Sequence, residues 1–263
     1  MGNATDILEI ENHGAVRVLT LNRPDVRNAL NTPLLQSLRA AVADAGATSV
    51  RCLVLTGAGK GFCAGADMTV WAEADASGYA EESPWMEEMH GLIRDVAAYP
   101  KPSIAVLNGA AVGSGLDLAL ACDFRFAVDS ARFICAYTRL AYPPDAGGTW
   151  LLPRVVGVEA AKRFVFTGET WQAPEALARG LVSEIHTADT LMPKALAFAD
   201  TLAQGPTLAQ IEAKRLIDSW QSRSLEDQLQ LERTAGERCA DSGDFREAMA
   251  ASIERRPPAF RGE

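Results

Sequence analysis

Two short apolar runs, each followed by a glycine-rich stretch, constrain the fold of this chain more than any other feature of its sequence. Residues 50–56 and 103–108 are almost continuously apolar. Strands are almost continuously apolar when helices cover both of their faces, and such strands are typical of parallel sheets. Helical patterns separate the runs, so the sequence predicts an α/β fold with a mainly parallel sheet and crossover helices.

The rest of the chain continues this alternation and then becomes helical. Strands are expected at residues 15–21, 124–128 and 132–135, and helices at residues 32–45, 81–99 and 150–154. From Leu191 onward the pattern is almost entirely helical. We therefore divide the chain into a core over residues 1–200 and a C-terminal helical domain over residues 201–263, of a kind that often forms contacts between subunits.

Charge and composition narrow the class of protein. The 263 residues carry a formal net charge of −9, which argues against sequence-independent nucleic-acid binding because that needs a basic face. The first ten residues include Asp6 and Glu9 and lack the apolar region of a signal peptide, and no uncharged apolar run is long enough to span a membrane. The five cysteines are odd in number and lack metal-ligand spacing. These features predict a cytoplasmic protein without a bound metal.

The first glycine-rich stretch, residues 57–67, invites comparison with a phosphate-binding loop. It fails the Walker pattern, because Gly61 follows Lys60 where that pattern has Ser or Thr. One interpretation is a tight turn between a strand and a helix. The other is that this turn offers the backbone N–H of Ala66 to an oxygen atom of a ligand.

The second glycine-rich stretch, residues 108–123, begins a helix that is expected to be buried. Its glycines let the backbone approach a ligand closely, and a helix start leaves its first N–H groups unpaired. Here the N–H of Ser114 would meet the N–H of Ala66 at one oxygen atom, forming an oxyanion hole. The same helix carries Asp117, a carboxylate that is costly to bury without a partner. A backbone anion site beside a buried acid can stabilise and protonate an enolate.

Taken in order, motifs along nearly the whole chain resemble those of the crotonase family, also called the enoyl-CoA hydratase/isomerase superfamily. The matching segments are residues 19–24, 28–30, 62–67, 101–102, 108–109, 113–115, 122–123, 145–149, 167–168, 180–182 and 258–262. The resemblance implies a spiral of ββα units with a C-terminal α-helical domain for trimerisation. It also implies acyl-CoA thioester substrates, trimers or hexamers made of two trimers, and no cofactor apart from the coenzyme A of the substrate.

The resemblance assigns roles to individual residues. It gives the two N–H groups of the oxyanion hole to Ala66 and Ser114. The residues implied for the adenine and pantetheine path, and for closing over the nucleotide end of coenzyme A, are Ala64, Asp67 and Met68, and Phe260 and Arg261 respectively.

Asp117 is one candidate for moving protons. It matches the first catalytic acid of the family's hydratases, in which Glu is usual, although an acid near a helix start can also serve as a cap. Tyr137 stands where the second hydratase acid is expected. Two carboxylates that share a water molecule help its addition to a double bond, and this chain has lost one of them.

Asp145 compensates for that loss. It lies in a segment, residues 142–154, that closely resembles the ring-opening isomerases of phenylacetyl-CoA breakdown and related Δ3,Δ2-enoyl-CoA isomerases. In those enzymes an aspartate here shuttles a proton between C2 and C4 of the enoyl chain. One base with a raised pKa in an apolar pocket suffices for this 1,3-shift. The alternative is that Asp145 caps a turn ahead of two glycines.

His90 raises a rival reaction. In hydrolytic 4-chlorobenzoyl-CoA dehalogenases, an aspartate at the position of Asp145 attacks the ring, a histidine at the position of His90 activates water, and a Trp stands in place of Tyr137. Here Tyr replaces that Trp, and Asp117 stands where those enzymes have an uncharged residue. Both departures count against dehalogenation. A single histidine in a helix is also most often a surface or core residue.

We therefore predict an acyl-CoA enzyme that stabilises a thioester enolate and either shifts or hydrates the double bond of an enoyl-CoA, with isomerisation favoured. Asp145 is expected as the principal acid/base, assisted or replaced by Asp117. The alternatives are a 4-chlorobenzoyl-CoA-type dehalogenase using Asp145 and His90, and a non-catalytic binding protein with the same fold. The presence of both acids argues against the last of these.

Overall fold

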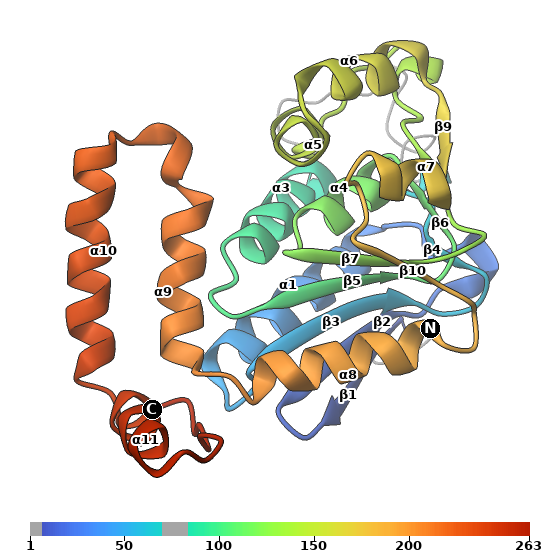
Figure 1. Cartoon of the computed structure of the whole chain (residues 1–263). Coiled ribbons are helices and arrows are strands. Elements are labelled where there is room, and N and C mark those ends of the chain that lie inside the picture. Colours follow the sequence, from blue (N-terminus) through green and yellow to red (C-terminus); the bar gives the residue numbers. More distant parts are fainter. Residues whose placement is uncertain (1–6, 70–83) are drawn as a thin grey trace.

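The large sheet of the molecule is mainly parallel. The structure is a computed structural model that describes residues 7–69 and 84–263 (Figure 1). Within these residues the large sheet contains β1 (Leu8–His13), β2 (Val16–Leu21), β3 (Cys52–Gly57), β5 (Ser103–Leu107), β7 (Phe124–Val128) and β10 (Glu184–His186), hydrogen-bonded in that order. Only the pairing of β1 with β2 is antiparallel. The predicted α/β fold is confirmed.

A second, smaller sheet gives the chain its repeating pattern. It contains β4 (Gly61–Cys63), β6 (Ala110–Val112), β8 (Arg132–Ile134) and β9 (Thr170–Gln172), and β4, β6 and β8 are parallel. Consecutive strands, such as β3 and β4 or β5 and β6, enter the large and the small sheet in turn. The helices that follow these pairs are α3 (Pro84–Ala97), α4 (Ser114–Leu120) and α5 (Gly148–Val156). Each unit is thus a ββα repeat, as expected.

Helices cover both faces of the large sheet and bury its central strands. Every residue of β3 and β5 is buried. In Figure 1, α8 (Leu191–Ala203) crosses in front of the large sheet, and α1 (Thr32–Ala47) packs with α3 behind it. The side chain of Asn31 accepts a hydrogen bond from the N–H of Leu34, 3.1 Å away, which caps the start of α1. Burial on both faces explains why these strands read as apolar runs.

Further helices lie between the elements already described. They are η2 (Pro24–Val26), η3 (Thr138–Leu140), α6 (Val158–Thr167) and α7 (Ala173–Ala178). Across residues 7–69 and 84–263, every helix is too short or too polar to span a lipid bilayer. The start of the expected helix over residues 81–99 lies outside the described residues, which resume at Pro84.

The last helices stand away from the sheets (Figure 1). They are α9 (Thr207–Asp218), η4 (Trp220–Ser222), α10 (Leu225–Ala240) and α11 (Gly243–Glu254). Glu212 of α9 is 3% exposed and forms ion pairs with Arg215 at 2.8 Å and Arg238 at 2.7 Å, the second of which ties α10 to α9. The expected domain boundary at residue 200 falls in the last turn of α8, which packs on the large sheet.

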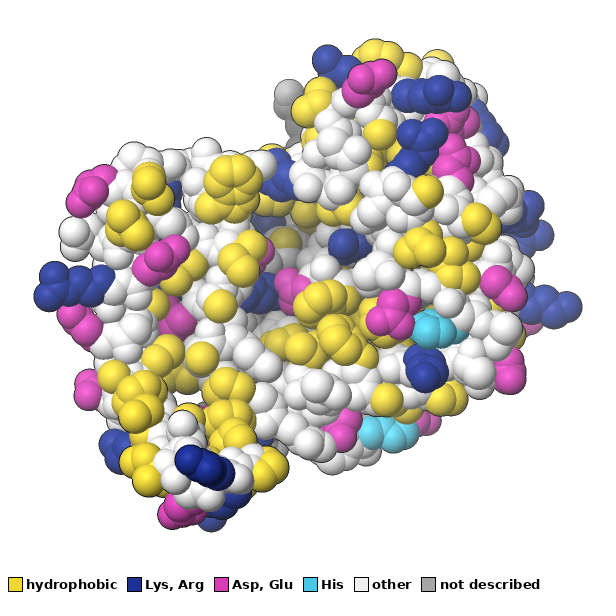
Figure 2. All heavy atoms as spheres, in the orientation of Figure 1, with side chains coloured by type: hydrophobic (Ala, Val, Ile, Leu, Met, Phe, Trp, Pro, Cys, Tyr) yellow, Lys and Arg dark blue, Asp and Glu magenta, His cyan; other side chains and the backbone are white. Residues whose placement is uncertain are grey.

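A groove separates these helices from the core. It has a volume of about 580 Å³, and Trp150, Lys214, Ile217 and Trp220 are among the residues that line it. Figure 2 shows hydrophobic side chains along the C-terminal helices and in the hollow beside them. Large exposed apolar side chains of this region are Ile217, Trp220, Leu225, Leu229, Met249 and Ile253.

Candidate active site

Two turns that follow neighbouring strands of the small sheet lie side by side. β4 and β6 are parallel, with Gly61 opposite Ala110 and Cys63 opposite Ala111. The residues after each strand therefore emerge at the same edge of the sheet. Ala66 follows β4 and Ser114 follows β6, so the fold brings together the two turns that the sequence singled out.

The N–H of Ala66 faces away from the core segment beside it. The N–H of Leu30 donates to the carbonyl of Gly65 at 2.8 Å, and the N–H of Asp67 donates to the carbonyl of Leu30 at 3.0 Å. In an extended segment, the backbone groups of the residue between two such contacts point to the opposite side. The N–H of Ala66 is thus directed away from Leu30, where it can meet a ligand.

The N–H of Ser114 belongs to the open start of α4. Gly113 precedes the helix with φ of 51°, and the first helical hydrogen bonds run from Leu116 and Asp117 to its carbonyl. Ser114 lies within the first turn, whose N–H groups have no acceptor inside the helix. Its hydroxyl is buried and has no hydrogen-bond partner among the described residues, a state that is uncommon in native structures.

Glycine at position 65 allows the two turns to approach each other. Its φ is 88°, and a Cβ atom there would lie 2.7 Å from the carbonyl oxygen of Val112 and 3.6 Å from the nitrogen of Ser114. Any side chain would push the turns apart. The arrangement therefore presents two backbone donors over a short distance, which is what stabilising negative charge on one oxygen requires.

Asp117 is held in a tight and apolar site. Its Oδ2 accepts a hydrogen bond from the hydroxyl of Tyr137 at 2.6 Å. A Cβ atom on Gly148 would lie 2.3 Å from Oδ1, so the backbone of α5 presses on the other oxygen. A cavity of about 10 Å³ beside it is lined mostly by apolar side chains, including Leu152 and Phe164.

Burial sets the proton affinity of this pair. It raises the pKa of Asp117 from 3.8 to about 8; the hydrogen bond from Tyr137 opposes the rise, and the nearby charge of Asp145 adds to it. Burial, and then the charge of Asp117, hold the pKa of Tyr137 well above 10. At neutral pH Asp117 is therefore protonated.

Asp145 lies at the edge of the same site. It belongs to the segment between η3 and α5 that has no regular secondary structure, and it is half-buried. Its charge acts on both Asp117 and Tyr137. Nε2 of His90, from α3, lies 2.7 Å from the main-chain oxygen of Asp145. The structure thus brings Asp117, Tyr137 and Asp145 close together, and His90 contacts the backbone of Asp145.

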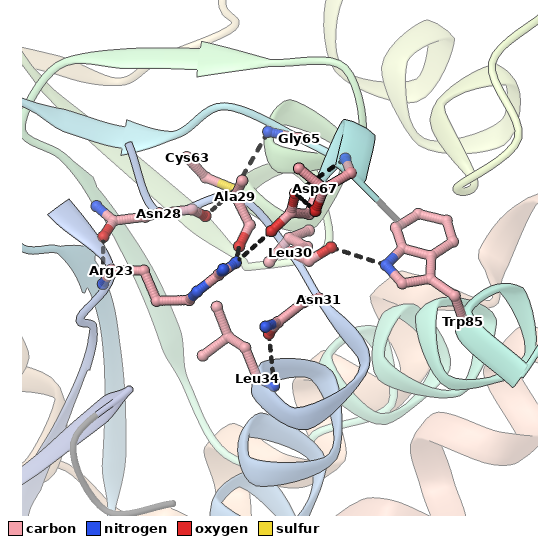
Figure 3. Close-up of polar contacts among 11 residues, drawn as sticks. Arg23, Asn28, Ala29, Leu30, Asn31, Leu34, Cys63, Gly65, Asp67 and Trp85 are labelled. Atoms are coloured by element: carbon pink, nitrogen blue, oxygen red, sulfur yellow. Dashed lines mark hydrogen bonds and ion pairs between the residues drawn. The ribbon is translucent and has the colours of Figure 1, made fainter. Parts of the chain in front are cut away.

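The carboxylate of Asp67 is engaged by its own chain (Figure 3). It lies 2.9 Å from Arg23, accepts hydrogen bonds from Thr69, and is 6% exposed. Burial alone would raise its pKa, but the hydrogen bonds from Thr69 and Arg23 outweigh burial and lower it. Of its neighbours expected on the coenzyme A path, Ala64 is half-buried and Met68 is 54% exposed.

Two residues that support the first turn had been assigned no role from the sequence. Arg23 holds Asp67 and also donates to the carbonyl of Ala29. Asn28, fully buried, donates to the carbonyls of Ala58, Gly61 and Phe62 at 2.9–3.1 Å. Its φ of 58° is one that Asn tolerates better than most residues. An asparagine and an arginine beside a proline turn were the only signal available.

Phe260 and Arg261 are held by Arg51 and Asp244 of their own chain. The N–H of Arg261 donates to Asp244 at 2.7 Å, and Arg51 donates to the carbonyl of Phe260 at 3.3 Å. Arg51 lies just before β3, and Asp244 lies in the first turn of α11. The expected closure of Phe260 and Arg261 over the nucleotide end of coenzyme A stays a prediction.

The fold and the paired backbone donors define a class of protein that acts on acyl thioesters. The sequence profile described as Enoyl-CoA hydratase/isomerase matches residues 11–263. The chain belongs to this family, so the resemblance to crotonases is confirmed. It is an acyl-CoA enzyme of the enoyl-CoA hydratase/isomerase type, and the alternative of a non-catalytic protein is not supported.

Individual relatives span nearly the whole chain. A probable enoyl-CoA hydratase of Rhodobacter capsulatus is 40% identical over 93% of this chain and 94% of its own. The 1,2-epoxyphenylacetyl-CoA isomerase of Escherichia coli is 37% identical over 94% of this chain and 95% of its own. The crystal structure of an enoyl-CoA hydratase from Bacillus anthracis superposes with a TM-score of 0.93 at 34% identity, covering 98% of this chain and 100% of that one.

Proposed function

We propose that the chain catalyses the shift of a double bond in an enoyl-CoA thioester. The observation that carries the proposal is the pairing of Tyr137 with Asp117, 2.6 Å apart, next to the charge of Asp145. Tyr137 occupies the position where the resemblance places the second acid of hydratases. The remaining groups suit a reaction that moves one proton along the chain.

Each residue then has a role. Asp145 takes a proton from C2 of a 3-enoyl thioester, and the electron pair moves onto the thioester oxygen. The N–H groups of Ala66 and Ser114 stabilise the resulting enolate, and removing one donor of this kind commonly costs 10²–10³ in rate. The protonated Asp145 then returns the proton at C4, which forms the conjugated 2-enoyl product. Asp117, protonated at neutral pH, assists as a second acid.

Hydration is the second candidate function. A buried carboxylic acid such as Asp117, with a pKa near 8, can deliver a proton to the carbon next to the thioester. The Rhodobacter relative is named a probable hydratase, which favours keeping this reaction in view. Dehalogenation is less favoured, because Nε2 of His90 is occupied by the carbonyl of Asp145 and not aimed at the carboxylate.

A panel assay tests these roles. Crotonyl-CoA, a 3-enoyl-CoA and 4-chlorobenzoyl-CoA are offered to the natural protein and to Asp117→Asn and Asp145→Asn. We expect turnover of the 3-enoyl-CoA, its loss by a factor of at least 10² in Asp145→Asn, and a smaller loss in Asp117→Asn. Full isomerase turnover by Asp145→Asn would show that the assignment of the base is wrong.

We further propose that the chain works as a trimer, or as a hexamer of two trimers, in the cytoplasm. The exposed apolar side chains of η4 and α10, such as Trp220 and Leu225, support an interface there. Phe260 and Arg261 would then reach the coenzyme A bound to a neighbouring copy, and Ala64, Asp67 and Met68 would line its path. No cofactor beyond the coenzyme A of the substrate is proposed. Sedimentation analysis should give three or six times the mass of 28.1 kDa.

A further inference from the structure

We propose that His90 is a positioning residue, which holds Asp145 in place through a hydrogen bond to its main-chain oxygen. The proposal rests on the proposed function, because it presumes that the carboxylate of Asp145 moves the proton. It assigns His90 a role that differs from the water activation of the dehalogenases, since the ring acts on the backbone of Asp145 and not on water.

The contact itself shows which nitrogen of the ring carries a hydrogen atom. Nε2 of His90 and the main-chain oxygen of Asp145 are 2.7 Å apart. A carbonyl oxygen can only accept, so Nε2 must carry the hydrogen atom. In the neutral ring, Nδ1 is then the acceptor. While Nε2 donates in this way, it cannot accept a proton from water.

The segment that carries Asp145 needs such support. Residues 141–147 connect η3 to α5 without regular secondary structure, and the N–H of Tyr142 donates to the carbonyl of Tyr137 at their start, 3.1 Å away. A loop of this kind is placed by the contacts that it makes with rigid elements. The position of the Asp145 carboxylate therefore depends on what holds residues 141–147.

α3 supplies two contacts on one face. Ile93 follows His90 by three residues, so both side chains lie on the same side of the helix. A Cβ atom on Gly147 would lie 3.1 Å from Cγ2 of Ile93, which places residue 147 directly on α3. His90 and Ile93 thus contact the chain at Asp145 and Gly147. These two contacts determine the distance from Asp145 to the pair formed by Asp117 and Tyr137.

Two variants of His90 separate positioning from proton transfer. In His90→Gln, the amide nitrogen replaces Nε2 and can still reach the carbonyl of Asp145. In His90→Asn, the amide nitrogen replaces Nδ1 and falls short of it. His90 is exposed, so neither change removes a buried side chain. The pair is therefore matched in chemistry and differs in reach.

We expect His90→Gln to keep kcat on a 3-enoyl-CoA within about threefold of the natural protein. His90→Asn should lower kcat by at least tenfold with KM unchanged within twofold, because a displaced catalytic group slows the chemical step. Undiminished kcat in His90→Asn would overturn the proposal. A loss in His90→Gln equal to that in His90→Asn would also overturn it, since the ring would then be needed for its own proton chemistry.

A measurement without substrate tests the hydrogen bond independently of the reaction. The ¹³C resonance of the Asp145 carbonyl reports whether that oxygen accepts a hydrogen bond. It should shift in His90→Asn and stay in place in His90→Gln, and an unmoved resonance in both would overturn the proposal. If the natural protein turned over no enoyl-CoA but the ¹³C shifts were as expected, the proposed reaction would be wrong. The hydrogen bond from His90 to Asp145 would still be supported.

Discussion

The hydroxyl of Tyr137 donates a hydrogen bond of 2.6 Å to Oδ2 of Asp117, which lies in the first turn of α4. The backbone of Gly148 presses on the other carboxylate oxygen. Asp117 is therefore held from both sides in a buried site. A second carboxylate at position 137 would repel it, whereas a phenol fixes its orientation. The chain has a fixed, protonated acid where the family's hydratases have two acids.

Removing the phenol should alter the acid that it holds. In Tyr137→Phe, Asp117 loses a bond that lowers its pKa, so the pKa rises above about 8. Activity that needs protonated Asp117 declines as the pH rises through that pKa, and this decline should move to higher pH in the variant. We also expect kcat/KM at pH 7 to fall about tenfold, the equivalent of one hydrogen bond of about 1.4 kcal/mol. The pH profile of kcat/KM measures both effects.

If kcat/KM of Tyr137→Phe declined at the same alkaline pH as that of the natural protein, the attribution of this decline to Asp117 would be contradicted. It would mean that the decline belongs to another group, or that the reaction does not use the proton on Asp117. A matched profile of Asp117→Asn distinguishes these outcomes, because that variant has no acid to titrate at position 117.

The buried acid should also make stability depend on pH. Folding raises the pKa of Asp117 from 3.8 to about 8, so the native state holds a proton that the unfolded state releases. This favours the native state below pH 4, and the advantage is lost as the pH rises to 8. Asp117→Asn has no carboxyl group at this position, so it has no such advantage to lose. The free energy of unfolding of Asp117→Asn, relative to the natural protein, should therefore increase between pH 4 and pH 8, by up to about 5 kcal/mol.

Urea denaturation at pH 5, 7 and 9 measures that difference. Other titrating groups are common to both proteins and cancel in the comparison. A difference that stays flat over this range would show that Asp117 ionises in the folded protein as readily as in the unfolded chain.

Gly148→Ala should damage the site by crowding. Its Cβ atom would lie 2.3 Å from Oδ1 of Asp117, so the carboxylate or the start of α5 must move. Overpacking of this kind costs about 1–3 kcal/mol, and we expect kcat to fall at least tenfold. Gly236→Ala is the control, because nothing lies within 4 Å of its Cβ position in α10. That change should keep kcat and stabilise the protein by about 0.5–1 kcal/mol.

The buried strands could be predicted from the sequence because burial on both faces leaves a plain signal. Residues 50–56 and 103–108 correspond closely to β3 (Cys52–Gly57) and β5 (Ser103–Leu107). β1 was not predicted, since Leu8 is its only buried residue and its apolar/polar alternation covers only residues 8–11. β4 and β6 are three residues long and lie inside glycine-rich stretches, where propensity indicates turns.

The contacts within the site depend on the tertiary structure and could not be predicted. Ala66 and Ser114 could be paired in advance because each follows a strand, and parallel strands end at one edge. The hydrogen bond from Tyr137 to Asp117 joins residues of different elements, and no pattern of residue spacing along the chain predicts it. The bond from His90 ends on a main-chain oxygen. Since every residue has such an oxygen, the sequence carries no sign of which one is used.

Gly65→Ala tests whether the two turns form a working anion site. The φ of Gly65 is 88°, and its Cβ atom would lie 2.7 Å from the carbonyl of Val112, so the turns bearing Ala66 and Ser114 must separate. Gly157→Ala is the matched control: its φ is 83°, but its Cβ would have nothing within 4 Å. Both changes should cost about 1–2 kcal/mol of stability through backbone strain. Only Gly65→Ala should also lose about 10² in kcat, because separated donors no longer meet one oxygen. Equal kcat in the two variants would show that these backbone groups do not stabilise the reacting oxygen.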